Sequence, residues 1–73
     1  MHAVVIGLAE TGLAVTRRLR SEGWEVTVVE DAPSGNDAYA DRAAAARGLG
    51  ARLDEAPATS AVVVEIGTAD LVV

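Results

Sequence analysis

A short segment near the start of the chain has the residue types and spacing of a loop that binds a diphosphate. It runs from Gly7 to Gly12, reads GLAETG, and matches the pattern G-x-G-x-x-G with alanine in the middle position. Gly7 permits a tight turn, the small Ala9 lets the backbone approach a pyrophosphate, and Gly12 lets a following helix pack closely on the preceding strand. The free N–H groups at the start of that helix would face the anion.

An acidic residue stands where a nucleotide-binding unit of this kind needs one. Glu30 follows Gly12 by eighteen residues and closes an apolar run. In a nicotinamide or flavin site, an acid at this point accepts hydrogen bonds from ribose hydroxyls and disfavours a 2′-phosphate. The competing interpretation is a solvated acid at the end of a strand.

Two side chains inside the loop need separate accounts. Glu10 brings a carboxylate next to the expected anion, and like charges repel, so we expect this side chain to turn outward to solvent. Thr11 can either cap the helix or donate its hydroxyl to a phosphate oxygen, and capping is the more economical explanation.

The loop and Glu30 require a strand, a helix and a second strand around them, and the residues predict all three. His2–Ile6 is a β-branched apolar run typical of a strand covered on both faces. Thr11–Glu22 has apolar residues at helical spacing, and Gly23 supplies a stop. Glu25–Glu30 is a second branched run. Strand, helix and strand within about 30 residues make a βαβ unit with parallel strands.

The rest of the chain predicts two further helices and two short strands. We expect a helix from Asn36 or Asp37 to Arg47 and strands at Ala51–Leu53 and Asp70–Val73. The predicted fold class is therefore α/β and Rossmann-like, with a short parallel sheet of about four strands flanked by helices and incomplete at its C-terminal end.

The segment Thr59–Ile66 admits two interpretations. Its valines and isoleucine favour a strand by propensity, because β-branched side chains lose freedom in a helix. The alternation of strands and helices in a layered sheet favours a helix instead, capped by Ser60, stopped by Gly67, and with Val62, Val63 and Ile66 on one face. We choose the helix.

Composition limits the chemistry that this chain can perform. The 73 residues contain no cysteine and no lysine, and His2 is the only histidine, which we interpret as a tolerated surface residue. Disulfides, thiol chemistry, a P-loop lysine and a zinc cluster are excluded. The net charge of −5 without a basic run argues against nucleic acid and membrane partners. With no spanning apolar run and no leader, we expect a cytoplasmic protein.

The longest stretch of informative sequence resembles a known family. VVIGLAETGLAVTRRLRSEGWEVTVVED is similar to the amino-terminal domain of the Mur ligases, specifically the UDP-N-acetylmuramoyl-L-alanine:D-glutamate ligases, whose first strand and loop commonly read VVIGLGxTGLS. The closing ADLVV is similar to the family's strand before a Ser-Pro-Gly loop. The resemblance therefore spans nearly the whole chain and is strongest over the first 31 residues.

The resemblance implies roles for particular residues. Residues 1–73 would form one domain that holds the UDP of a nucleotide sugar, as the N-terminal fragment of a larger multidomain enzyme. Glu30 would stand where the family has an acid near the uracil. Asp31 would take the next position, and Ala32 follows where a basic side chain can occur. The loop amides that would meet the pyrophosphate are those around Ala9, Glu10 and Thr11.

The resemblance also implies a reaction. In the family, ATP activates the substrate carboxylate to an acyl phosphate, which the amine of D-glutamate attacks to build a peptidoglycan precursor. ATP and magnesium act in a central domain, and this chain has no G-K-[ST] motif and no convincing metal cluster. We therefore expect no catalytic residue, no bound cofactor and no metal in this segment. The expected partners are UDP-N-acetylmuramoyl-L-alanine and the remaining ligase domains.

Other functions fit the same residues. A NAD- or FAD-binding half-domain of an oxidoreductase is one, because Gly7, Gly12 and Glu30 match that fingerprint about as well. A regulatory nucleotide-sensing module of a transport system is another, since it needs binding but no chemistry. A domain used only for assembly is the third.

Overall fold

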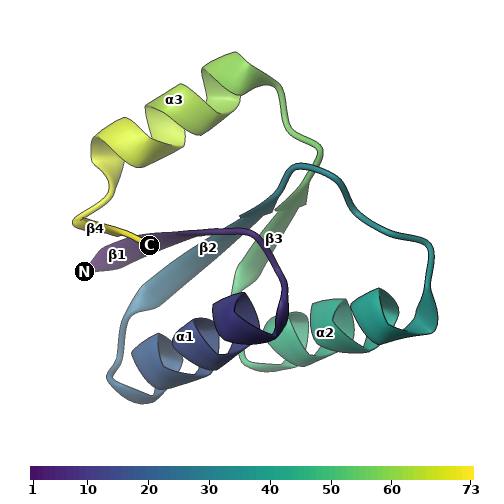
Figure 1. Cartoon of the computed structure of the whole chain (residues 1–73). Helices are drawn as coiled ribbons and strands as arrows, with labels where there is room; N and C mark the ends of the chain where they lie inside the picture. Colours follow the sequence, from purple (N-terminus) through teal and green to yellow (C-terminus); the bar gives the residue numbers. More distant parts are fainter.

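Four parallel strands form one sheet at the centre of the molecule (Figure 1). The structure is a computed structural model and describes all 73 residues. The strands lie in the order β3-β2-β1-β4, and every neighbouring pair is parallel. Their bounds are β1 (His2–Ile6), β2 (Glu25–Glu30), β3 (Arg52–Glu55) and β4 (Leu71–Val72). The predicted α/β class and parallel sheet are confirmed, and the arrangement is compatible with a Rossmann-like fold.

The helices cover the two faces of the sheet unequally. Helices α1 (Glu10–Ser21) and α2 (Asp37–Gly48) lie on one face, and α3 (Thr59–Thr68) lies on the other (Figure 1). The helix predicted for the ambiguous segment is thus confirmed. None of the three helices is both long and apolar enough to cross a membrane.

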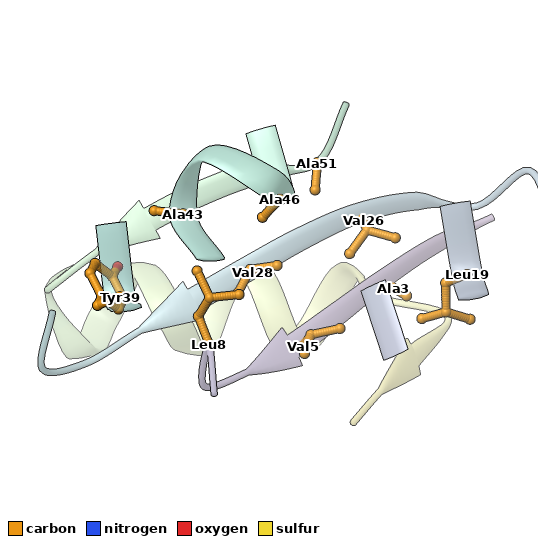
Figure 2. Close-up of a cluster of buried hydrophobic side chains, with 10 residues drawn as sticks. All are labelled: Ala3, Val5, Leu8, Leu19, Val26, Val28, Tyr39, Ala43, Ala46 and Ala51. Carbon is orange, nitrogen blue, oxygen red and sulfur yellow. The ribbon is translucent and has the colours of Figure 1, made fainter. Parts of the chain in front are cut away.

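The core lies between the sheet and the helices α1 and α2 (Figure 2). Ala43 and Ala46 of α2 are buried against it, and their small side chains let this helix approach the strands closely. Close packing therefore accounts for the alanine-rich segment. The buried residues of this cluster are Ala3, Val5, Leu8, Leu19, Val26, Val28, Tyr39, Ala43, Ala46 and Ala51.

The ends of two helices bear out two of the sequence predictions. Asn36 caps α2, because its Oδ1 accepts a hydrogen bond of 2.8 Å from the Tyr39 N–H. Gly23 follows the end of α1 with a φ of +86°, a conformation that a glycine adopts without strain. Both features agree with the residue types from which these helix ends were predicted.

Several predicted limits are wrong by one or two residues. Helix α1 begins at Glu10 rather than Thr11, and β3 runs over Arg52–Glu55 rather than Ala51–Leu53. Ser60 does not cap α3, because Ala58 occupies the cap position without a side-chain hydrogen bond. Gly67 does not stop it either, since the helix continues to Thr68. Neither Ser60 nor Gly67 forces the chain out of helical geometry.

Helix α3 buries less apolar surface than its sequence suggests. None of its residues is fully buried, and Val63 is 63% exposed. Val62 and Glu65 lie on the side that is half covered, whereas Val63 and Ile66 are exposed. Val62, Val63 and Ile66 are in a helix as predicted, but only Val62 of the three is partly covered.

His2, which the sequence predicts to be a tolerated surface residue, makes a contact with the neighbouring strand. His2 is half-buried at the start of β1, and its Nε2 lies 2.9 Å from Oγ1 of the buried Thr27 on β2. This pair joins the two central strands at their amino ends.

At Gly12, α1 packs directly against the end of β1. A Cβ atom built on Gly12 would lie 2.0 Å from the carbonyl oxygen of Gly7. The backbone would have to move to make room for it. Any side chain at this position would push the first turn of α1 away from the end of β1.

We therefore predict that Gly12→Ala destabilises the protein, although alanine is ordinarily better than glycine within a helix. The expected loss is about 2 kcal/mol or more in the free energy of unfolding, as for overpacking of a tight contact. Urea unfolding followed by circular dichroism measures it. Gly48→Ala is the matched control, because a Cβ there meets nothing within 4 Å, and it should be neutral or slightly stabilising. A Gly12→Ala variant as stable as the wild type would contradict the observed packing.

Candidate functional site

The predicted loop lies at the carboxyl end of β1, directly before α1. Gly7 has a φ of +95° and donates its N–H to the Val29 carbonyl of β2 at 2.8 Å. Ala9 is the N-cap residue, in extended conformation, and no side chain caps the helix. The tight turn, the small residue and the strand-loop-helix context that the pattern requires are therefore present.

The start of α1 leaves a group of backbone donors without partners. Leu13 is the first residue whose N–H is bonded in the helical manner, to the Ala9 carbonyl at 3.0 Å. The N–H groups that precede it and donate no hydrogen bond within the protein are those of Ala9, Glu10, Thr11 and Gly12. Free amides at a helix N-terminus carry partial positive charge and favour an anion.

The first residues of this helix start lie at the protein surface. Ala9, Glu10 and Thr11 are all exposed. Glu10 forms no ion pair, in agreement with an outward-facing carboxylate. Thr11 does not cap the helix, because it lies inside the first turn and Ala9 holds the cap position, so that preferred role is wrong. Its other predicted role, as a hydroxyl donor to phosphate, stays a prediction.

Glu30 is directed at the loop. Its Oε1 accepts the Leu8 N–H at 2.9 Å, and its Oε2 accepts the Ala32 N–H at 3.0 Å. These backbone donors, that of Leu8 first and that of Ala32 second, hold the pKa of the Glu30 carboxyl below its usual value, and the nearby Arg42 charge lowers the pKa further. The interpretation of Glu30 as a merely solvated strand-end acid is therefore wrong, because the carboxylate braces the loop.

Sequence reasoning missed one residue of the site. Arg42, on α2, donates its Nε–H to the Leu8 carbonyl at 2.9 Å. Leu8 is thus held on both sides of its backbone, with Glu30 on its N–H and Arg42 on its C=O. No spacing in the sequence signals this contact, because it depends on how α2 lies against the β1–α1 loop.

Asp31 is not brought into the site by any contact. It is exposed, and its side chain forms neither a hydrogen bond nor an ion pair within the protein. The prediction that Asp31 lies beside the nucleoside therefore depends only on its position next to Glu30 in the sequence. The structure also contains no group of three or more histidine and acidic side chains that could hold a metal ion.

The only cavity of the molecule lies at the opposite end of the sheet. It is open, has a volume of about 410 Å³, and includes His2, Glu25 and Arg52 from the amino ends of three strands. Ligands of open parallel sheets bind beyond the carboxyl ends of the strands. The partnerless amides lie at the carboxyl edge of the sheet, whereas the cavity lies at its amino edge. The loop is therefore the better candidate for a ligand-binding site.

Comparisons with protein-family models, with curated proteins and with solved structures find no match to this chain. The resemblance to the Mur ligases therefore rests on the residues of the loop and the strands alone.

The brace formed by Glu30 predicts a pH-dependent contribution to stability. The pKa of Glu30 is lower in the folded protein than its ordinary value of 4.5, so the carboxylate stabilises the fold above pH 4.5. This stabilisation is lost as the pH falls through the lower, folded pKa. Glu30→Gln keeps an acceptor for Leu8 but loses one for Ala32, and should cost about 1 kcal/mol at pH 7. The difference from wild type should shrink as the pH falls below 4.5.

Chemical denaturation at a series of pH values between 3 and 7 measures this difference. Glu25→Gln is the control, because the exposed Glu25 side chain makes no hydrogen bond or ion pair. A Glu30→Gln effect of equal size at pH 3 and pH 7 would show that the carboxylate charge does not brace the loop.

Proposed function

We propose that this chain binds a nucleoside diphosphate at the GLAETG loop, namely the UDP portion of UDP-N-acetylmuramoyl-L-alanine. The observation that carries the proposal is the run of partnerless amides from Ala9 to Gly12 at the carboxyl edge of a parallel sheet. A diphosphate has several acceptor oxygens, which can bond to several adjacent N–H donors. Its negative charge is stabilised by the positive end of the helix dipole.

The brace around Leu8 supports binding rather than a passive turn. Glu30 and Arg42 hold the loop backbone by two hydrogen bonds of 2.9 Å, so the amides that follow are ordered before any ligand arrives. Pre-ordered donors spare a ligand the entropy cost of arranging them. Such an arrangement suits a site that takes a charged ligand from water.

Glu30 retains capacity for a nucleoside. Each of its carboxylate oxygens accepts one hydrogen bond from the backbone and has a further lone pair free. A ribose hydroxyl and the N3–H of uracil are both donors that such an oxygen accepts. The hydrogen-bonding capacity of Glu30 is therefore compatible with UDP and also with NAD, and the resemblance of the loop sequence is what favours UDP.

The role in a longer enzyme follows from the same proposal. As part of a Mur-type ligase, this segment would hold the substrate while ATP, magnesium and the attacking amine act in another domain. The side chains around the loop are carboxylates, a hydroxyl and a guanidinium, and none of the chain's residues is a lysine or cysteine nucleophile. Substrate binding is accordingly the activity that we assign to the segment.

Isothermal titration with three ligands tests the proposal. UDP and UDP-N-acetylmuramoyl-L-alanine should bind the chain, and NAD should bind at least about tenfold more weakly, a difference of about 1.4 kcal/mol. Tight binding of NAD without any response to the uridine compounds would instead establish the oxidoreductase-type interpretation.

We further predict that Glu10→Gln leaves UDP binding unchanged or strengthens it by up to about fivefold. The exposed Glu10 carboxylate lies next to the amides, and removing a screened like charge is worth at most about 1 kcal/mol. The same titration measures it, with Glu25→Gln at the far end of the sheet as the control. A large loss of affinity in Glu10→Gln would mean that this carboxylate contacts the ligand.

A further inference from the structure

The two edges of the sheet differ in how they are protected. β3 and β4 each have a neighbouring strand on one side only. The β3 edge carries charged side chains, and two of them, Arg52 and Asp54, form an ion pair at 3.0 Å. Charged side chains are a common means of keeping an edge strand from pairing with another chain. β4 and the residue after it read LVV, with no charge and no proline, so this edge is unprotected.

The outer edge of β4 has backbone groups available for pairing. Val73 donates its N–H to the Val4 carbonyl at 2.9 Å, and its own carbonyl accepts the Ile6 N–H at 2.9 Å. Both backbone groups of Val73 therefore point toward β1. Successive residues of a strand direct these groups to opposite sides. The N–H and C=O of Val72 accordingly point away from β1, toward the open edge.

Apolar side chains lie on both faces of this edge. Ala3 and Val5 belong to the core beneath α1 and α2, so the side chain of Val4 points to the α3 face of the sheet. Val72 is the register partner of Val4 and points to the same face. Leu71 is the register partner of Ala3 and points to the opposite face. Both are exposed, so β4 presents apolar surface on each of its faces.

Helix α3 adds apolar residues on the β4 side. Val63 and Ile66 are three residues apart and share one side of the helix, whereas Val64 lies on the side opposite Ile66. α3 leads from the end of β3 to the start of β4, so it runs antiparallel to the strands (Figure 1). A right-handed crossover then turns the side with Val63 and Ile66 toward β4. The residues of this edge patch are Ile6, Val63, Ile66, Leu71, Val72 and Val73.

The edge patch has the size and character of a protein interface. Its residues expose about 450 Å², roughly a tenth of the 4247 Å² surface of the molecule. Two copies facing each other would bury about 900 Å² from these residues alone, and the backbone between them brings the total to the roughly 1,000 Å² that a specific interface needs. The patch contains no charged side chain, a depletion that is found at the core of interfaces.

Charge and symmetry favour a second copy of this chain as the occupant. The net charge is −5, so most surfaces of two copies repel each other. A two-fold contact sets the uncharged edge patch against itself without that repulsion. The backbone of Val72 fits the same symmetry. In an antiparallel pair, two opposed residues can exchange both N–H···O bonds, and a residue on a two-fold axis opposes its own copy.

We infer that two copies of this chain form a dimer through the edge patch, with β4 paired antiparallel to the β4 of the second copy at Val72. This pairing joins the two four-stranded sheets into one continuous sheet. The inference does not depend on the proposed function, because it uses neither the loop amides nor Glu30.

Sedimentation velocity tests the inference at about 5 to 500 µM protein, a range that covers the micromolar dissociation constants of weaker interfaces. Wild type should pass from monomer to dimer within this range. Val63→Asp should weaken the dimer at least about tenfold, because it places a carboxylate from each copy in an apolar contact. Val64→Asp is the matched control. It makes the same change on the other side of the same helix, at an exposure of 65% against 63%, and should stay within about twofold of wild type.

Val72→Pro examines the backbone pairing. The Val72 N–H points away from β1, so proline should leave the fold intact by circular dichroism and thermal unfolding while it weakens the dimer at least about tenfold. Hydrogen exchange of the wild type gives the same information without a substitution, since the Val72 amide should become more protected as the protein concentration rises.

Three results would overturn the inference. The first is a wild-type chain that stays monomeric throughout the concentration range. The second is a dimer that neither Val63→Asp nor Val72→Pro weakens, because its contact would lie on another surface. The third is growth into larger, open-ended assemblies, because a two-fold contact closes at two copies. UDP binding is measured separately, so its failure would leave the dimer standing.

Discussion

The arrangement of the site depends on the contact between Gly12 and the carbonyl of Gly7. Because Gly12 has no side chain, the first turn of α1 can sit directly on the end of β1, and a Cβ there would be only 2.0 Å from the Gly7 oxygen. That close approach places the partnerless amides of the helix start at the carboxyl edge of the sheet. Moving the helix away would separate the donors from Glu30 and from the end of β2.

The loop is held by opposite charges that come from two different elements. Glu30 at the end of β2 accepts a hydrogen bond from the Leu8 N–H, and Arg42 of α2 donates one to the Leu8 C=O. The side chain of Leu8 meanwhile lies in the core (Figure 2). Core packing and two charge-assisted hydrogen bonds therefore fix Leu8, and this also orders the backbone amides that follow it. The free side of the loop is where we propose that a ligand binds.

Local patterns were enough to predict most of the fold, and they failed where tertiary contacts decide. Apolar runs and glycine stops predicted the order of strands and helices, because burial of a parallel sheet requires them. They also indicated the loop and Glu30. They could not predict that Glu30 binds the Leu8 backbone, that Arg42 reaches it from α2, or that Val63 faces solvent. Each of these depends on distances between elements far apart in the sequence.

The central claim is that the free amides of the α1 start receive the phosphates of a nucleotide. The most direct measurement is a titration of the ¹⁵N-labelled chain with UDP, followed through the backbone amide signals. The account predicts that the amides of Ala9, Glu10 and Thr11 shift most, and that their protons move downfield as charge-assisted hydrogen bonds form. The largest shifts at the amino edge of the sheet, around His2 and Thr27 beside the cavity, would contradict it.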